Sequence, residues 1–283
     1  MIMKFWRSTY NSMYDVDYIR NKLNISISVN IFDEIDSTNE EAKRRIAIGQ
    51  KNDFVLVARM QTAGKGRKGR NFYSPMDTGI YMTYTHFTDD SIEQSIKTTA
   101  ATSVVVKNAI KDATGLDCGI KWVNDIYLNG KKVCGILCEC ILKNTYDNDK
   151  NAIIIGIGIN LTTSDYPEDI SDKAGPVISY NDTVASSEHV LSFEDISHDI
   201  RNDIVSYIID GLYLFFSDKD YDFIDDYRNS SIVLGKRVEL SDASGIYAKG
   251  FVKDILDNGE LLLLDDNNQE KVIDSGEISL IVL

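Results

Sequence analysis

Three glycines in a short basic stretch limit the folds open to this chain. Gly64, Gly66 and Gly69 fall within six residues. Glycines at this density oppose a stable helix and let the backbone approach a ligand closely. Apolar, strand-like segments lie on both sides, at residues 54–60 and 79–87. We therefore expect a loop that connects one strand to the next and binds a ligand.

The charge of this loop contrasts with that of the whole chain. Five basic residues and no acidic one lie from Arg59 to Arg70, whereas the 283 residues include 44 acidic and 30 basic ones, a formal net charge of -14. An acidic surface repels nucleic acids and anionic lipids, so an anion has to be bound by a local basic patch. Phosphate is the ligand that these glycines and cations favour; a solvated loop without a ligand is the alternative.

Two nucleotide-binding fingerprints resemble the loop, but neither suits its surroundings. The spacing Gly64-x-Gly66-x-x-Gly69 matches the dinucleotide fingerprint, whose third glycine lies in a helix that receives the pyrophosphate. Here residues 71–75 cannot begin a long helix, and a strand follows. The loop also lacks the Lys-Ser/Thr ending of a P-loop. The sequence therefore excludes both standard nucleotide-binding folds.

Hydrophobic periodicity and turn residues predict the other elements. We expect helices at residues 16–23, 37–49, 91–115, 193–216 and 221–227, and strands at 29–32, 54–60, 79–87, 119–123, 126–128, 133–142 and 152–158. Residues 162–192 are polar and turn-rich, which predicts a loop over the site or on the surface. From Ile232 the pattern changes to five short strands in about 50 residues, which predicts a small barrel and a domain boundary near residue 231.

Ser37 begins the second predicted helix and has two interpretations. Ser37 and Glu40 form a capping-box pattern, in which the serine hydroxyl accepts a hydrogen bond from the backbone of the first turn. From this stretch alone, helix capping is the favoured interpretation of Ser37 and Thr38. Contact with a ligand is the alternative.

Two strands carry further candidates. Lys121 stands next to Trp122 in a strand suited to burial, and a buried lysine needs an anionic ligand or a carboxylate. Asp125 is the structural candidate for that carboxylate. Gly156 and Gly158 end an apolar strand, so either a ligand approaches the backbone closely there or the strand contains a simple bulge.

The cysteines and the termini bear on metal binding and location. Cys134, Cys138 and Cys140 lie in a segment that reads as a buried strand, where cysteine is a small apolar filler, and no histidine or fourth ligand stands at metal spacing. The three histidines are far apart and receive no catalytic role. The first residues contain no apolar segment typical of export, and no apolar run approaches the about 20 residues of a membrane span. We expect a reduced, cytoplasmic protein.

Five segments together resemble the biotin protein ligases, also called biotin-[acetyl-CoA-carboxylase] ligases, in the family's order from about residue 15 to the end. They are Asp36-Ser37-Thr38-Asn39, the loop from Gln61 to Arg70, Lys121-Trp122-Val123-Asn124-Asp125, Gly135-Ile136-Leu137 followed by Glu139, and Gly156-Ile157-Gly158-Ile159-Asn160. The departures are Lys65 and Lys68 where arginine is common, Phe72 where tryptophan is frequent, and Val123 for the usual proline. Lysine keeps the charge but lacks the bidentate fork of arginine.

The resemblance implies an α+β fold of the class II synthetase type. A mixed, largely antiparallel sheet with helices would form a catalytic biotin- and ATP-binding domain over residues 1–231, and residues 232–283 would form a small C-terminal SH3-like β-barrel. Many bacterial members carry an N-terminal DNA-binding domain of which about 60 residues would be missing here, so the resemblance is to the monofunctional type. No DNA or membrane partner is expected, and exposed sheet edges leave room for a homodimer.

The resemblance also implies a two-step reaction without an enzyme nucleophile. Biotin and MgATP give biotinyl-5'-AMP and pyrophosphate, and a lysine of a biotin carboxyl carrier domain then attacks the mixed anhydride. Lys121 and Arg67 would be catalytic. The implied biotin-binding residues are Ser37, Thr38, Asn39, Gln61, Gly64, Lys65, Gly66, Arg67, Lys121, Gly135 and Gly158. The implied ATP- and adenylate-binding residues are Lys65, Arg67, Arg70, Lys121, Asn124 and Asn160. Mg²⁺ is expected with ATP, and no protein ligand for it is assigned.

Two other functions remain open at this stage. A lipoate-protein ligase also adenylates a carboxylic acid and modifies a carrier lysine, but the basic glycine loop argues against it. A nucleic-acid-binding protein would use residues 59–70 with the terminal barrel. The net charge of -14 and the lack of aromatic residues interleaved in the basic patch argue against that alternative.

Overall fold

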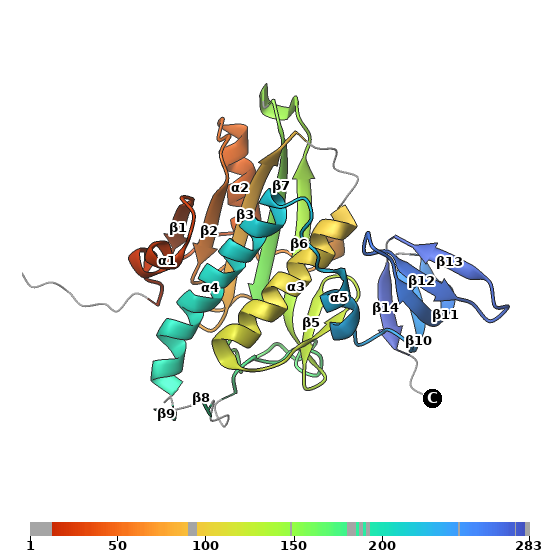
Figure 1. The fold of residues 1–283 in the computed structure, drawn as a ribbon. Coiled ribbons are helices and arrows are strands. Elements are labelled where there is room, and N and C mark those ends of the chain that lie inside the picture. The colour runs from red at the N-terminus through yellow and green to blue at the C-terminus, as the bar shows by residue number, and fades with distance from the viewer. Residues whose placement is uncertain are drawn as a thin grey trace, which may run out of the picture.

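The computed structural model describes residues 13–89, 95–147, 149–179, 185–186, 189–190, 193–242, 244–274 and 276–280. A large sheet with helices on both faces stands beside a smaller, separate sheet formed by the C-terminal segment (Figure 1). Among the described residues, no helix is both long and apolar enough to cross a membrane.

The large sheet has seven strands in the order β1-β2-β3-β7-β6-β5-β4. Only the pair β1 and β2 is parallel, so the sheet is mixed and largely antiparallel, as expected. The basic loop connects the antiparallel neighbours β2 and β3, which confirms the strand-to-strand prediction. The strands are β1 (Ser28–Phe32), β2 (Phe54–Ala58), β3 (Ile80–Thr88), β4 (Gly119–Lys121), β5 (Asp125–Leu128), β6 (Lys131–Ile141) and β7 (Asn151–Ile159).

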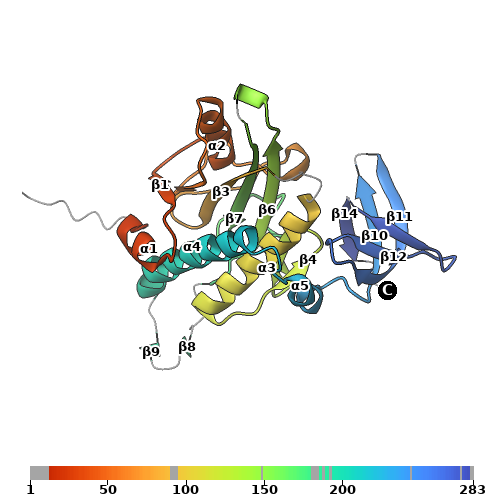
Figure 2. The ribbon, with the colours of Figure 1, turned by 45° about the horizontal axis from the view of Figure 1, so that its top comes forward.

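Helices cover both faces of this sheet because its strands are apolar on both sides. Val55 and Val57 point into a core shared with α3 and α4, whereas Phe54 and Leu56 point into a second core beneath α2. Figure 2 shows α3 and α4 on one face of the sheet and α2 on the other. The start of the third predicted helix, residues 91–94, lies outside the described residues. The helices are α1 (Val16–Lys22), α2 (Thr38–Ala47), α3 (Ser95–Thr114), α4 (Phe193–Ser217) and α5 (Ile224–Ser230).

The C-terminal sheet contains the five predicted strands, all antiparallel, in the order β13-β12-β11-β10-β14. Its apolar interior is continuous with α3, α5 and Trp122, which lies in the turn between β4 and β5, because the strand predicted at residues 119–123 ends at Lys121. The indole of Trp122 donates a hydrogen bond to the Gly259 carbonyl at 3.0 Å. This contact holds the small sheet beside the large one. The strands are β10 (Arg237–Asp242), β11 (Gly245–Ile255), β12 (Leu261–Leu264), β13 (Glu270–Ile273) and β14 (Glu277–Leu280).

A buried arginine on α4 fixes the far end of the basic loop. Arg201 is fully buried and donates to the backbone carbonyls of Gly79 and Asp77, the latter at 2.7 Å. The Asp77 carboxylate in turn accepts two hydrogen bonds from Arg59, each 2.7 Å long, at the near end of the loop. The two ends of the loop are therefore clamped together.

Two predictions about local structure were incomplete. Cys134 is buried, but Cys138 is only half-buried and Cys140 is exposed. The segment predicted as a loop at residues 162–192 includes a short hairpin of β8 (Ala185–Ser186) and β9 (His189–Val190), and part of it lies outside the described residues.

Candidate functional site

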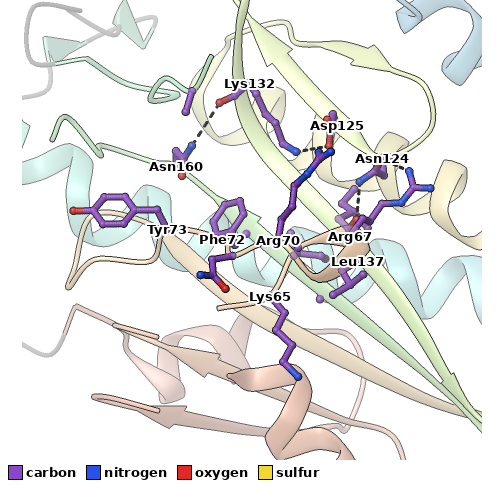
Figure 3. A pocket seen from close by; sticks show the side chains of 18 of the residues that line it. Lys65, Arg67, Arg70, Phe72, Tyr73, Asn124, Asp125, Lys132, Leu137 and Asn160 are labelled. Carbon is purple, nitrogen blue, oxygen red and sulfur yellow. Dashed lines mark hydrogen bonds and ion pairs between the residues drawn. The ribbon is translucent and has the colours of Figure 1, made fainter. Parts of the chain in front are cut away.

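A cavity of about 810 Å³ opens on the α2 face of the large sheet, between the basic loop and the C-terminal sheet (Figure 3). All but one of the residues assigned from the sequence line it. They are Ser37, Thr38, Asn39, Gln61, Lys65, Gly66, Arg67, Arg70, Lys121, Asn124, Gly135, Gly158 and Asn160. Gly64 is the exception: it is a buried residue of the loop, and an added Cβ there would come within 2.5 Å of the Phe72 carbonyl oxygen.

The cavity is strongly cationic although the chain is acidic. Six basic residues line it against two acidic ones, Asp125 and Asp169. Such a concentration of positive charge in a hollow attracts anions and raises their local concentration. The basic residues are Lys65, Arg67, Arg70, Lys121, Lys132 and Lys173.

The basic loop is folded on itself and distributes its charges in different directions. The Gly66 amide donates to the Arg70 carbonyl at 2.7 Å, and Phe72 donates to Gly64 at 2.8 Å. Arg67 donates to the Asn124 side chain at 2.8 Å, which holds its guanidinium at the cavity. In contrast, Arg59 and Lys68 do not line the cavity. Arg59 pairs with Asp77 where the loop begins and ends, and the Lys68 amine lies 3.5 Å from the Ser241 carbonyl on β10.

The start of α2 contradicts the capping prediction. Ser37 occupies the N-cap position, but its side chain makes no capping hydrogen bond. The Glu40 carboxylate binds Lys43 and Lys65 instead of the helix end. Gln61 from the basic loop replaces the cap, because its side-chain oxygen accepts the backbone N–H of Thr38 at 2.9 Å. Ser37 is consequently a buried residue of the cavity wall.

Residues that face one another across five strands form a row, and four of them, Gly158, Gly135, Asp125 and Lys121, form the cavity floor. The register pairs Tyr81 with Gly158, Gly158 with Gly135, Gly135 with Asp125, and Asp125 with Lys121. The two glycines leave a trough in the middle of this row. The Phe72 ring fills part of the trough, since a Cβ on Gly158 would stand 2.5 Å from its Cε1.

Lys121 differs from the buried lysine that the sequence suggested. It is half-buried, and its amine lies 5.4 Å from the centroid of the Tyr127 ring. Burial, and then the Asp125 carboxylate, raises the pKa of Tyr127 to about 12, so this ring stays neutral. The carboxylate of Asp125 forms its ion pair with Lys132, at 2.5 Å (Figure 3).

The sequence analysis missed a cavity wall formed by residues 166–174. This segment is fixed to β6, where Lys132 and Lys173 are joined by a backbone hydrogen bond of 2.8 Å. The rings of Tyr73 and Tyr166, 6.3 Å apart, meet between the basic loop and this wall. No local pattern marks these residues in a polar, turn-rich stretch. Only the alternative of a loop over the site pointed to them.

Within the described part of the chain, no group of three or more His, Cys, Asp or Glu residues is placed to hold a metal ion. A magnesium ion that enters with a nucleotide needs only one or two carboxylates beside the phosphates. Asp125 and Asp169 are the carboxylates that the cavity offers.

Comparisons with known proteins match both parts of the chain. The biotin/lipoate A/B protein ligase family matches residues 31–160, and the biotin protein ligase C-terminal domain matches residues 233–281. The bifunctional ligase/repressor BirA of Bacillus spizizenii is 35% identical over 144 residues, which are 50% of this chain and 43% of that protein. The aligned region thus spans less than half of that relative.

Other similarities extend over most of the chain. The biotin--[acetyl-CoA-carboxylase] ligase of Mycobacterium tuberculosis is 26% identical over 250 residues, 86% of this chain and 85% of that protein. The structure of the biotin protein ligase from Aquifex aeolicus in complex with biotin and ATP has a TM-score of 0.68 and 25% identity, and the match covers 90% of this chain and 98% of that chain.

Proposed function

Because the chain belongs to the biotin/lipoate A/B protein ligase family and carries the biotin protein ligase C-terminal domain, we propose that it is a biotin protein ligase. It activates biotin with MgATP to biotinyl-5'-AMP and then transfers the biotin to a lysine of a biotin carboxyl carrier domain. The proposal includes a cytoplasmic location and a homodimer formed through the edge strand β1, because the opposite edge strand, β4, already accepts a hydrogen bond from Ile232 at Ile120.

The cationic cavity is the observation that carries this proposal. The first step brings together a carboxylate and a triphosphate, which repel each other in water. Six basic side chains around one cavity offset that repulsion and stabilise the charge that builds up at the α-phosphate. The enzyme needs no nucleophile of its own, because the substrate carboxylate attacks the phosphorus.

We assign the phosphate end of the cavity from its charges. Lys121, at the end of the floor row, lies between the biotin carboxylate and the α-phosphate and is the principal catalytic cation. Arg67, oriented by Asn124, binds the adenylate phosphate. Arg70 and Asn160 face the nucleotide. All of these positions line the same cavity.

We assign the uncharged end of the cavity to the ureido ring of biotin. Ser37, Thr38, Asn39 and Gln61 offer hydroxyl and amide groups there, and Ser37 does not use its hydroxyl for capping. A ligand so placed points its carboxylate toward the basic loop and Lys121.

The chemistry follows from this placement. A biotin carboxylate oxygen attacks the α-phosphorus while the bond to the pyrophosphate oxygen breaks, and the basic residues neutralise both oxygens. The carrier lysine, as a neutral amine, then attacks the acyl carbon, and AMP leaves as an amide bond forms. Positioning and electrostatic stabilisation supply the rate enhancement. The glycine-rich loop excludes water from the anhydride by closing over it.

A lipoate-protein ligase is the second candidate, because the family that matches residues 31–160 includes both types. The C-terminal match and the biotin--[acetyl-CoA-carboxylase] ligases among the relatives favour biotin. Nucleic-acid binding through the basic loop is disfavoured, because Lys65 and Arg67 are held at the cavity by Glu40 and Asn124.

One assay separates these functions. The protein is incubated with ATP, Mg²⁺, a biotin carboxyl carrier domain and either biotin or lipoate, and the acid that becomes linked to the carrier is identified. We expect biotin only. Lys121→Ala should fold normally yet lose biotin-dependent pyrophosphate exchange by about two orders of magnitude or more. Lys253→Ala, a lysine paired with Glu270 on the C-terminal sheet, is the matched control. Retained exchange in Lys121→Ala would remove this residue from the mechanism.

A further inference from the structure

A row of alternating charges connects the biotin end of the cavity to the basic loop. Glu139 on β6 lies behind the cavity wall and does not line the cavity. One of its carboxylate oxygens accepts a hydrogen bond from Asn39 at 2.9 Å, and the other binds Lys43 at 2.7 Å. The Glu40 carboxylate lies 2.8 Å from Lys43 and 2.6 Å from Lys65, the first cation of the loop.

The carboxylate of Glu139 determines which way the Asn39 amide points. A carboxylate only accepts hydrogen bonds, so the amide nitrogen must face Glu139 and the oxygen must face the other way. There the Thr83 hydroxyl donates to the amide oxygen at 2.6 Å. Gly156 leaves the room that this arrangement needs, because a Cβ on it would stand 2.3 Å from that oxygen. Asn39 is buried and held from three sides.

The charged side chains of this row are partly buried, so water screens their interactions only in part. The side chains of Glu40, Lys43 and Glu139 are 28–30% exposed. Hydrogen bonds from Lys43 first and Lys65 second lower the pKa of Glu40. Burial alone would lower the pKa of Lys43, but Glu139 and Glu40 together raise it. Glu40 and Lys43 therefore stay charged at neutral pH.

We propose that Glu139 is a positioning residue for biotin activation. It orients Asn39 at the uncharged end of the cavity and binds Lys43. Without the negative charge of Glu139, Lys43 binds Glu40 alone and competes with Lys65 for the same Glu40 carboxylate oxygen, Oε1. The ion pair that joins Lys65 of the basic loop to α2 is then weakened, while the hydrogen bonds of Gln61 to Thr38 remain. This inference rests on the proposed function, because the cavity that Asn39 lines is the biotin site assigned above.

The test compares Glu139→Gln with Glu41→Gln. Glu41 lies on the same helix as Glu40 and pairs with Arg44 and Arg45, outside the row and away from the cavity, so it is a matched control. The ligand-free variants are exposed to trypsin, and cleavage after the basic residues 65, 67, 68 and 70 is followed by mass spectrometry. We expect Glu139→Gln to speed this cleavage about fivefold, the effect of one weakened, partly sheltered ion pair, and Glu41→Gln to leave it unchanged.

The same substitution in the Lys65→Met variant tests whether Glu139 acts on the loop through Lys65. Lys65→Met already removes the ion pair with Glu40, so adding Glu139→Gln to it should not speed cleavage at the three remaining sites any further. Biotin kinetics should change at the same time: the KM of Glu139→Gln for biotin rises about tenfold while kcat stays within about twofold, because Asn39 is misaligned and the cations of the cavity are intact. Glu139→Asp, which keeps the charge, should recover part of both effects.

The outcomes are separable. The inference is wrong if trypsin cleaves the loop of Glu139→Gln at the wild-type rate. It is also wrong if Glu139→Gln speeds cleavage equally in the wild-type and Lys65→Met backgrounds. An unchanged KM for biotin together with a lower melting temperature would overturn it as well. If the wild-type protein does not activate biotin, the proposed function fails and with it the role of Glu139 in biotin activation, whereas the cleavage ratios still decide whether the row holds the loop. If Glu139→Gln does not fold, Glu40→Gln interrupts the same row and the cleavage comparison decides.

Discussion

Gly158→Ala should disturb the cavity floor, whereas Gly135→Ala on the neighbouring strand should not. The two glycines are register partners and line the same cavity. A Cβ at residue 158 would meet three carbons of the Phe72 ring at 2.5, 2.6 and 2.9 Å. Ordinary carbon contacts begin near 3.5 Å, so the ring has to move by about 1 Å. A Cβ at residue 135 would instead meet the flexible end of Lys132 at 3.2 Å and Phe72 at 3.5 Å.

The expected magnitudes follow from overpacking. Forcing the Phe72 ring aside costs about 1–3 kcal/mol, and each kcal/mol lowers the melting temperature of a chain of this size by roughly 2–4 °C. The Gly135→Ala change should stay within about 0.5 kcal/mol. Thermal unfolding measures both. A displacement of about 1 Å at the floor should also weaken biotin activation by up to about a hundredfold in Gly158→Ala.

A compensating substitution makes this reasoning refutable. Phe72→Leu shortens the side chain that the new methyl group would strike, so it should restore part of the stability lost in Gly158→Ala. The double variant is then less destabilised than the sum of the two single changes. Equal melting temperatures for Gly158→Ala and Gly135→Ala, or strict additivity with Phe72→Leu, would show that the ring does not pack on Gly158 as described.

Two further changes test the loop and the start of α2. Arg67→Ala removes the guanidinium that Asn124 orients. Biotinyl-5'-AMP should therefore dissociate roughly ten to a hundred times faster, with little change in melting temperature. A lower melting temperature with an unchanged dissociation rate would show that Arg67 serves the fold and not the binding of the adenylate. Hydrogen bonds from Arg44, and then the Ser37 amide, lower the pKa of Asp36 to about 2. Because its pKa is lower in the folded protein, the ionised Asp36 carboxylate stabilises the fold above about pH 4, and this contribution is lost as the pH falls toward 2. In this pH range the free energy of unfolding should therefore fall more steeply for the wild type than for Asp36→Asn.

The path of the chain could be predicted because its signals are local. Three glycines between two apolar segments require a strand-to-strand loop, and the alternating C-terminal segment requires short strands, whatever lies nearby. The structure confirms the loop between β2 and β3 and the five strands after residue 236. The family resemblance rested on the same kind of signal, residue types in a fixed order, and the family matches confirm it.

The partners of the side chains could not be predicted, because they come from distant parts of the chain. The local sequence predicts Ser37 as the helix cap, but in the structure the side chain of Gln61 from the basic loop fills that role. The local sequence offers Asp125 as a carboxylate for Lys121, and it gives no sign of the ion pair that Asp125 makes with Lys132 from β6. In both cases a residue from another element makes a contact that the local pattern does not contain.

By itself, the sequence determined the order of the elements, the excess of positive charge at the loop and the resemblance to the biotin protein ligases. Only the tertiary structure decided that Lys121, Gly135 and Gly158 share one floor, and that Glu139 meets Asn39 across 100 residues of chain. The physical reason is that strand register and helix packing bring such groups together. Both depend on the whole set of contacts and not on any single segment.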